Sequence, residues 1–416
     1  MTSRSLSASH KSLRYNRGFS QLVDMSREQL LVVTERYWPE GSGGELATHL
    51  ILEVLRKEFD VVVLTGTRNP TKLPGVQYVY EPLLAKREKV WLWLNASRLA
   101  SSQRFQKMLR ESDVVYIPGF SFPVIPIAKR FGKNVVVHLH GYIPISYTAT
   151  VLAPYEQHRD TITRDDVMME CRKGLKYCVG VGVFWWLPRL ARRWVSQADA
   201  VICVSNRQCE IIMGWMPEIK GKSVVIYNPL PNISPVGKEL GEEKILLYLG
   251  GPSFVKGFHL VLKVADELLR KYRNLRILMT KMKGYRSLPS NCVALGELPY
   301  QDIVRLHSRA YALLFPSTWE EPQPYVVIES MLMGTIPIAA RTGGVPEVVA
   351  GSPAEGYLFT PGDVVEFMDK IEAVLTQSRD YLLDIGMKLR GHVLKLFSDV
   401  ENKIVKLFES VLTQKD

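Results

Sequence analysis

The sequence predicts an α/β protein of two domains, each built around a parallel sheet. Strand-like apolar runs alternate with helical patterns along the chain, which is typical of βαβ units. At 416 residues the chain exceeds an ordinary single domain and suits two domains of about 200 residues each. Residues 228–237 hold three prolines in ten positions, which makes this segment the natural linker.

The individual strands are predicted from short apolar runs that resemble buried parallel strands. In the first half these runs are residues 30–34, 61–65, 113–117, 134–138, 200–204 and 224–227. In the second half they are residues 244–249, 275–280, 310–315, 335–339 and 356–359. We therefore predict an N-terminal domain over residues 25–230 and a C-terminal domain over residues 238–390.

The first residues and the cysteines indicate in which cellular compartment the protein is expected. Residues 1–24 are rich in Ser and Arg and lack the apolar core of a secretory signal, which predicts a disordered tail. No apolar run reaches the roughly 18 residues that span a bilayer. The five cysteines show no spacing typical of a disulfide framework, so we expect free thiols in a reducing cytoplasm.

The charge of the chain is divided unevenly between its halves. The formal net charge is +11, and residues 1–237 hold all of it, with 31 basic and 20 acidic residues. A basic half-molecule indicates an anionic partner, either membrane headgroups or nucleic acid. Because the sequence contains no interleaved aromatic–basic module of a known nucleic-acid-binding fold, nucleic acid is not the expected partner.

The most informative motif lies between residues 315 and 329. Glu321 and Glu329 stand eight residues apart, after the apolar run 310–315 and across a helix start that Pro324 favours. In open α/β sheets, ligands bind at such carboxyl ends of strands. A helix N-terminus there offers N–H groups to a phosphate, and carboxylates accept hydrogen bonds from sugar hydroxyls.

This motif resembles the Glu-x7-Glu signature of the retaining glycosyltransferase family 4, also called glycosyltransferase group 1. The following residues 334–347 resemble the family's strand and Gly-Gly-x-Pro-Glu turn. The resemblance implies the GT-B fold, with two Rossmann-like domains facing each other across a cleft. It also implies that the helix over residues 391–416 crosses back to the N-terminal domain.

A second matching element is the sequence Gly-Gly-Pro-Ser-Phe-Val-Lys-Gly at residues 250–257. It resembles the family's diphosphate-binding loop, with Lys256 in the position of the phosphate-binding lysine. Gly251 stands where the family has an arginine, so another base such as Lys281 or Lys283 would have to substitute for it. Pro322-Gln323-Pro324 replaces the family's Gly-Phe-Gly, which stiffens the loop and removes N–H donors.

Two further elements of the first half resemble the family. Gly43 and Gly44 match a glycine pair that lets the first helix approach the donor diphosphate. His140, at the end of an apolar strand, resembles the family's cleft-floor histidine, although a buried structural histidine is the alternative. The resemblance implies His140 and Glu321 as catalytic residues. It implies these donor-binding residues: Gly43, Gly44, Gly250, Gly251, Lys256, Glu321, Tyr325, Val326 and Glu329.

The implied reaction is transfer of a sugar, with retention, from a nucleoside-diphosphate sugar to a glycan or lipid-linked acceptor. The sugar nucleotide is a co-substrate, and neither a cofactor nor a metal is expected. A nucleotide-sugar epimerase of the same fold, an inactive homologue and a nucleic-acid-binding homologue remain as alternatives. The first domain is expected to dock peripherally on an anionic membrane, because residues 86–98 and 177–193 combine tryptophans with basic residues.

Overall fold

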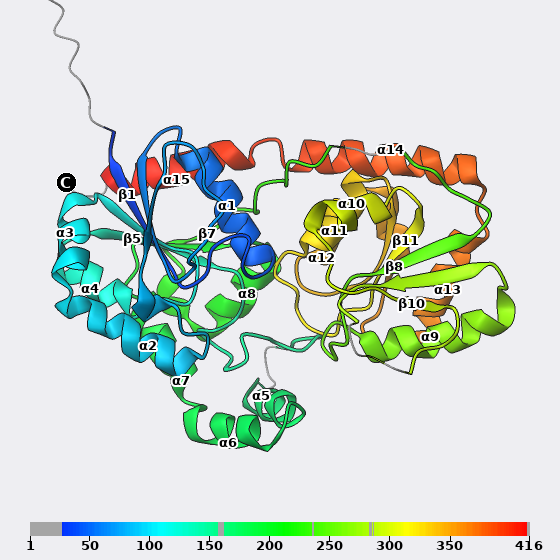
Figure 1. The fold of residues 1–416 in the computed structure, drawn as a ribbon, viewed down its shortest axis with the longest axis horizontal. Helices are drawn as coiled ribbons and strands as arrows, with labels where there is room; N and C mark the ends of the chain where they lie inside the picture. The colour runs from blue at the N-terminus through cyan, green and yellow to red at the C-terminus, as the bar shows by residue number, and fades with distance from the viewer. Residues whose placement is uncertain (1–26, 157–161, 235–236, 283–284, 286, 414–416) are drawn as a thin grey trace, which may run out of the picture.

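The computed structural model describes residues 27–156, 162–234, 237–282, 285 and 287–413. The tail predicted for residues 1–24 lies outside the described residues. The described chain forms two parallel sheets with helices on both faces, set side by side (Figure 1). The predicted α/β class with two facing Rossmann-like units is therefore confirmed.

The first sheet, together with helices α1 to α8, forms what we call the N-terminal unit. Its seven strands lie in the order β3-β2-β1-β4-β5-β6-β7, and every pairing is parallel. The strand order reverses between β1 and β4, and ligands of such sheets bind where the order reverses. The strands are β1 (Gln29–Thr34), β2 (Asp60–Thr65), β3 (Gln77–Tyr80), β4 (Val114–Ile117), β5 (Asn134–Leu139), β6 (Ala200–Cys203) and β7 (Ser223–Val225).

The second sheet, with helices α9 to α14, forms the C-terminal unit. Its six strands lie in the order β10-β9-β8-β11-β12-β13, and all its pairings are parallel. The strand order reverses between β8 and β11, which places a second ligand crevice opposite the first. The strands are β8 (Lys244–Tyr248), β9 (Leu275–Met279), β10 (Cys292–Ala294), β11 (Ala310–Phe315), β12 (Ile336–Ala340) and β13 (Leu358–Phe359).

The helices connect the strands in the way that βαβ units require. Those of the N-terminal unit are α1 (Gly43–Leu55), α2 (Lys89–Arg98), α3 (Gln103–Glu111), α4 (Val124–Arg130), α5 (Ile162–Cys171), α6 (Leu175–Phe184), α7 (Leu187–Val195) and α8 (Asn206–Trp215). Those of the C-terminal unit are α9 (Phe258–Lys271), α10 (Tyr300–Leu306), α11 (Tyr325–Leu332), α12 (Val345–Val349), α13 (Val364–Leu375) and α14 (Arg379–Leu396). The last helix is α15 (Val400–Thr413).

The end of the chain returns to the N-terminal unit. The predicted single helix over residues 391–416 is in fact the end of α14, a break at residues 397–399, and α15. Phe408 of α15 packs edge-on against Phe59 and Tyr116, with ring centroids 6.2 and 5.2 Å apart. The side-chain amide of Asn134 donates a 2.5 Å hydrogen bond to the carbonyl of Val411. These contacts tie the end of the chain to the first sheet.

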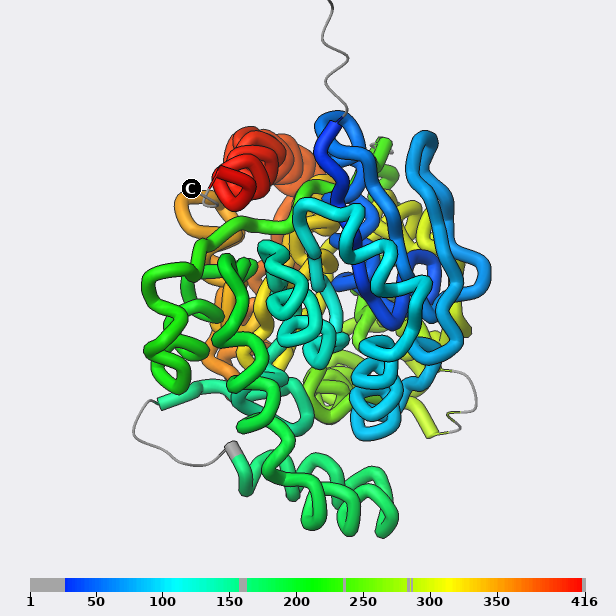
Figure 2. The backbone as a smooth tube through the Cα atoms, turned by 90° about the vertical axis from the view of Figure 1, so that its left-hand side faces the viewer, coloured from blue at the N-terminus to red at the C-terminus, as the bar shows by residue number. Residues whose placement is uncertain are grey.

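The segment between β5 and β6 carries a helical hairpin that projects from the N-terminal unit (Figures 1 and 2). We call residues 162–184, which form α5 and α6, the α5–α6 hairpin. The chain reverses at Gly174, where φ is +127°, and brings Cys171 and Cys178 together in a disulfide. The expectation of five free thiols is therefore wrong for this pair, while Cys203, Cys209 and Cys292 are free. Within the described residues, no helix has the length and apolar character needed to cross a bilayer.

Candidate functional site

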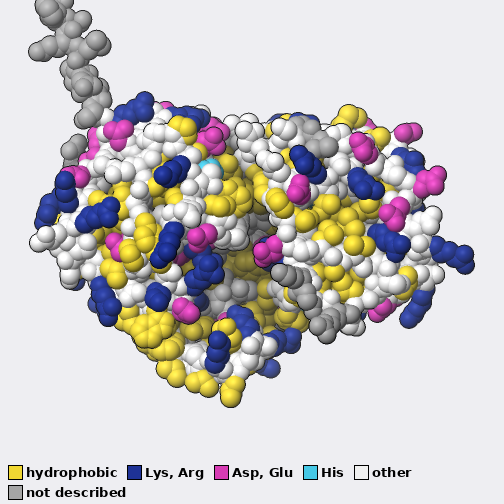
Figure 3. Space-filling model, in the orientation of Figure 1, with side chains coloured by type: hydrophobic (Ala, Val, Ile, Leu, Met, Phe, Trp, Pro, Cys, Tyr) yellow, Lys and Arg dark blue, Asp and Glu magenta, His cyan; other side chains and the backbone are white. Residues whose placement is uncertain are grey.

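The candidate site lies where the carboxyl ends of the two sheets face each other. Figure 3 shows the surface hollowed between the two units. The N-terminus of α1 meets the N-terminus of α11 there, because a Cβ at Gly43 would lie 3.3 Å from Cδ2 of Tyr325. The hydroxyl of Tyr325 also donates a 2.9 Å hydrogen bond to the carbonyl of Pro229 in the proposed linker. Gly43, Tyr325 and its half-buried neighbour Val326 therefore lie at one junction of the two units.

Gly44, the second glycine of the pair, lies closely against His140. A Cβ at Gly44 would lie 3.2 Å from Cβ and Cγ of His140, closer than side chains ordinarily approach. A glycine therefore lets the start of α1 approach this histidine closely, and a larger residue would have to displace the His140 side chain. The structure thus brings together two predicted site residues, Gly44 and His140, that are far apart in the sequence.

His140 is half-buried at the carboxyl end of β5, and its Nε2 is shielded from solvent. Burial lowers its pKa to about 4, so the imidazole is neutral at neutral pH. Its ring lies 4.1 Å from the ring of His138, measured between centroids, and His138 in turn is hydrogen-bonded to the hydroxyl of Tyr116 at 2.8 Å. Nε2 of His140 has no hydrogen-bond partner among the described residues. An unpaired buried nitrogen at a cleft is available to a ligand hydroxyl.

Glu321 lies in the loop between β11 and α11 and is almost completely buried. Its Oε1 accepts hydrogen bonds from Nε1 of Trp319 at 2.6 Å and from the hydroxyl of Ser317 at 3.1 Å, and it forms an ion pair with Lys256. The main chain of the loop is held by the Gly-Gly turn, since the N–H of Gly344 donates to the carbonyl of Glu321 at 2.8 Å. The ion pair joins two predicted site residues that are 65 positions apart.

Lys256 comes from the glycine loop between β8 and α9. Gly257 has a left-handed φ of +75°, and a Cβ there would lie 1.8 Å from the carbonyl oxygen of Pro316. Only a glycine allows this approach of the loop to the end of β11. The N-terminus of α9 has no side-chain cap, and neither does that of α11. Lys256 and two uncapped helix N-termini create a positive region suited to an anion.

The two glycines that open this loop differ in their surroundings. A Cβ at Gly250 would lie 2.5 Å from the hydroxyl of Tyr248, so this position has no room for a larger side chain. Gly251 has a left-handed φ of +64°, and a Cβ there would lie 3.2 Å from Cβ of Lys281. Lys281, which follows β9, is exposed and itself has a φ of +61°. Of the two bases considered as substitutes for the arginine, Lys281 thus lies beside Gly251, while Lys283 lies outside the described residues.

Glu329 is buried one turn into α11. Oε1 accepts a 2.5 Å hydrogen bond from the hydroxyl of Tyr300, the first residue of α10. Burial raises the pKa of Glu329 to about 7, and the bond from Tyr300 opposes this shift. Tyr300 packs edge-on against Trp38, which follows β1, with ring centroids 5.9 Å apart. Glu329 is therefore not a solvated carboxylate on the helix surface.

The Pro322-Gln323-Pro324 sequence anchors the loop to the proposed linker. Oε1 of Gln323 accepts a 2.7 Å hydrogen bond from the main-chain N–H of Asn228. Pro324 is the residue that immediately precedes α11, rather than a member of its first turn as the sequence predicted. Nε2 of Gln323 is buried without a hydrogen-bond partner among the described residues.

A set of contacts that was not predicted from the sequence joins the two units beside the site. Nη2 of Arg207, in α8, lies 3.2 Å from Oε1 of Glu320. The carboxylate of Glu347, in α12, accepts hydrogen bonds from the main-chain N–H groups of Asn206 and Arg207 at 2.9 and 2.8 Å, and from the Tyr227 hydroxyl at 3.1 Å. Glu347 thus caps the start of a helix in the opposite unit. In the sequence, only the Gly-Gly-x-Pro-Glu turn, which contains Glu347, could have indicated these contacts.

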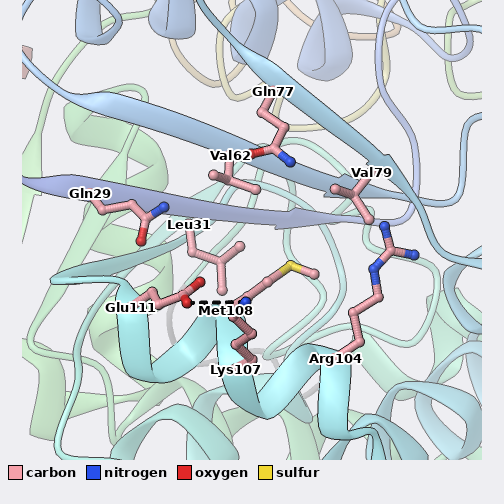
Figure 4. A pocket seen from close by; sticks show the side chains of 9 residues that line it. All are labelled: Gln29, Leu31, Val62, Gln77, Val79, Arg104, Lys107, Met108 and Glu111. Atoms are coloured by element: carbon pink, nitrogen blue, oxygen red, sulfur yellow. Dashed lines mark ion pairs between the residues drawn. The ribbon is translucent and has the colours of Figure 1, made fainter.

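A separate cavity lies at the opposite end of the first sheet. It has a volume of about 200 Å³ and lies between strands β1 to β3 and helix α3 (Figure 4). Its lining includes Gln29, at the start of β1, and the ion pair of Lys107 with Glu111 at 3.7 Å. The cavity is therefore remote from the carboxyl ends of the strands and contains none of the predicted site residues.

Two family models match consecutive parts of the chain. Glycosyltransferase Family 4 matches residues 41–231, and Glycosyl transferases group 1 matches residues 231–386. The two matches cover every predicted site residue and all strands of both sheets except β1. The chain belongs to glycosyltransferase family 4. It is therefore a glycosyltransferase (EC 2.4) that takes its sugar from a nucleotide-sugar donor, and its fold is GT-B.

The relatives are distant. Spore coat protein SA of Bacillus subtilis is 24% identical over 196 residues, which cover 37% of this chain and 52% of that protein. The chain therefore spans about half the length of this relative. Among solved structures, sucrose-phosphate synthase of Thermosynechococcus elongatus has a TM-score of 0.72 at 16% identity, covering 94% of this chain and 100% of the other. HepE of Anabaena in complex with UDP-glucose has a TM-score of 0.65 at 16% identity, covering 92% and 99%.

Proposed function

We propose that this family 4 enzyme is a retaining hexosyltransferase that transfers a sugar from a UDP-sugar to a glycan or lipid-linked acceptor. The acceptor is met at the cytoplasmic face of a membrane, where the enzyme is peripherally bound. The observation that carries the proposal is the convergence of Lys256, Glu321, Glu329 and His140 on facing sheet ends. The choice of UDP rests on the UDP-glucose complex of HepE, a structural relative.

The donor diphosphate is proposed to bind at the glycine loop. Lys256 and the uncapped N-terminus of α9 would neutralise its charge, and this charge increases as the sugar departs. In the structure Lys256 is paired with Glu321. When a diphosphate draws Lys256 toward it, the carboxylate of Glu321 becomes free to accept hydrogen bonds from the donor sugar. Glu329 would accept hydrogen bonds from the ribose hydroxyls of the nucleotide.

The sugar itself is proposed to lie against His140. In the reaction the bond from the anomeric carbon to the leaving phosphate oxygen breaks, and a bond to the acceptor oxygen forms on the same face. The acceptor proton passes to the departing phosphate. Because burial keeps His140 neutral, it does not repel positive charge that develops on the sugar ring, and Nε2 remains free to bond a sugar hydroxyl.

The membrane location is supported by the chemistry of the N-terminal unit. All of the formal net charge of +11 resides in residues 1–237, which form the half proposed to hold the acceptor. A cationic surface of this kind is attracted to anionic lipid. A lipid-linked acceptor would have to be met at the bilayer.

A donor screen followed by product analysis tests the proposal. The full chain is titrated with a panel of nucleotide-sugars by thermal shift and saturation-transfer NMR, and we expect a UDP-sugar to bind best. Turnover with glycan and lipid-linked acceptors should give a product whose anomeric configuration matches that of the donor, as read by NMR. Inversion would contradict the retaining assignment, and absence of binding to every nucleotide-sugar would favour an inactive homologue.

A donor-only reaction distinguishes the epimerase alternative. An epimerase converts the sugar without an acceptor, whereas a transferase releases UDP at a rate that depends on acceptor. Acceptor-independent formation of an epimeric sugar nucleotide would therefore overturn the transferase proposal.

A further inference from the structure

The α6 helix exposes apolar side chains where a helix of a globular protein normally exposes polar ones. Leu175, Val179 and Val183 are four residues apart and so form one stripe along the helix. Their exposed fractions are 80%, 58% and 57%. A helix that is apolar on all sides is ordinarily buried, so an exposed one indicates a missing partner.

The apolar surface continues onto neighbouring elements. Trp185 and Trp186, at the end of α6, are exposed, and so are Val167 and Met168 of α5. Helix α2 adds Trp91 and Leu94, whereas its Leu92 and Trp93 are buried in the core. Figure 3 shows hydrophobic side chains gathered along the edge of the molecule from α2 to the tip of the α5–α6 hairpin.

Basic residues surround this surface and acidic residues are scarce. Residues 172–198 contain six basic side chains and no acidic one: Arg172, Lys173, Lys176, Arg189, Arg192 and Arg193. The guanidinium of Arg189 lies 4.6 Å from the centre of the Trp185 ring. A groove between α4 and α7 is lined by the exposed Arg130 and Arg193. Aromatic, aliphatic and basic side chains together match the boundary between lipid headgroups and acyl chains.

The α5–α6 hairpin contacts both walls of the candidate site, through α5 and through the turn that follows it. Asp166 of α5 accepts hydrogen bonds from the main-chain N–H groups of Tyr147 and Thr148, each at 2.9 Å, in the loop that follows His140. The guanidinium of Arg172 lies 3.9 Å from the centre of the Phe254 ring, within the glycine loop of the C-terminal unit. The exposed surface is therefore located next to the opening of the site.

We propose that the α5–α6 hairpin, with the exposed face of α2, is the surface by which this enzyme docks on an anionic bilayer. The apolar stripe of α6 enters the headgroup region, and the surrounding bases bind lipid phosphates. Docking in this orientation presents the opening between His140 and the glycine loop to acceptors held in the membrane. The docking surface deepens the peripheral membrane binding of the proposed function and rests on it, while donor binding can be measured separately.

Flotation with vesicles tests the docking surface. The full chain is mixed with neutral phosphatidylcholine vesicles and with vesicles that contain phosphatidylglycerol, at low and high salt. We expect binding to the anionic vesicles, reduced by salt. The double variant Leu175→Glu/Val179→Glu should lose at least about tenfold in partitioning, because it places two charges in the apolar stripe. The matched control Val365→Glu/Met387→Glu alters residues that are 72% and 70% exposed in the C-terminal unit, and it should float like the wild type.

Two outcomes would overturn the proposal. One is equal flotation of the hairpin variant and the wild type, and the other is failure of the wild type to bind either kind of vesicle. Sedimentation velocity on the same proteins tests whether a second copy of the chain covers this surface instead of a bilayer. A wild type that dimerises and a hairpin variant that does not would also overturn the proposal. Binding of the nucleotide-sugar is measured in parallel by thermal shift, so failure of the docking surface and failure of the donor site give separate results.

Discussion

The hydroxyl of Tyr300 donates a hydrogen bond of 2.5 Å to Oε1 of Glu329, between the two units where the carboxyl ends of the sheets face each other. Glu329 is buried, and burial raises its pKa from 4.5 to about 7. A carboxyl group in this environment changes its charge near neutral pH. The protonation of Glu329 is therefore linked to the stability of the unliganded protein.

The first prediction concerns this pH dependence. Folded Glu329 holds its proton up to pH about 7, whereas in the unfolded chain it releases it near pH 4.5. Its contribution to stability is therefore full below pH 4.5 and is lost as the pH rises to about 7, by about 3 kcal/mol in total. Urea unfolding of wild type and Glu329→Gln at several pH values isolates this contribution. If the difference in free energy of unfolding between wild type and Glu329→Gln does not vary with pH, the raised pKa of Glu329 is wrong.

The second prediction concerns donor binding. Glu329→Ala and Lys256→Ala should each lower nucleotide-sugar affinity or turnover at least tenfold while the fold is retained. Under the proposed donor site each variant would remove a charge-assisted hydrogen bond to the donor, and a tenfold loss corresponds to about 1.4 kcal/mol. Lys395→Ala, at an exposed lysine of α14, is the matched control. Wild-type kinetics in either folded variant would remove that residue from the donor site.

The third prediction separates catalysis from packing at His140. His140→Ala should lower turnover more than donor binding, if the neutral imidazole bonds the sugar mainly as charge develops. A packing residue would instead lower the melting temperature and leave the rate per folded molecule unchanged. Single-turnover rates and melting curves on the same preparation decide between the two roles, and the second pattern would rule out the catalytic one.

The fold was largely predictable from apolar periodicity because most of the strands are central and buried. All six residues of β5 are buried and all six of β11 are too, and such strands give uninterrupted apolar runs. The two missed strands, β3 and β10, are the outer strands of their sheets. Their residues are mostly exposed or half-buried, and their apolar runs are short.

The site was predictable in part. Motif order along the chain predicted Lys256, Glu321 and Glu329, because Lys256 and Glu321 lie in strand-to-helix loops and Glu329 lies in the first turns of the helix that follows. The partners of these residues come from distant segments and have no local signature. Tyr300 meets Glu329 through packing of α10 on α11, and Arg207 meets Glu320 only because the two units face each other. The Cys171–Cys178 pair was missed because spacing alone does not show that a helical hairpin closes on itself.

The last prediction assigns Lys281 as the second cation of the diphosphate site. Gly251 stands where the family has an arginine, and its left-handed φ of +64° disfavours any larger residue. Lys281 lies beside it, at the carboxyl end of the neighbouring strand β9, and holds a φ of +61°. A non-glycine residue in this conformation carries strain that is common at functional sites.

Lys281→Ala should therefore weaken binding of UDP-sugar by about tenfold, the loss expected for one charge-assisted contact of about 1.4 kcal/mol. Lys281→Arg should retain most of the affinity, because it keeps the charge at the same position. Gly251→Arg should not compensate for Lys281→Ala, since the left-handed backbone at position 251 costs an arginine about 1–2 kcal/mol. Calorimetric titration of Lys281→Ala with UDP and with uridine tests whether Lys281 contacts the phosphates. If it does, the variant should bind UDP more weakly and uridine as the wild type does. An equal loss for uridine would mean that Lys281 supports the loop and does not contact the phosphates.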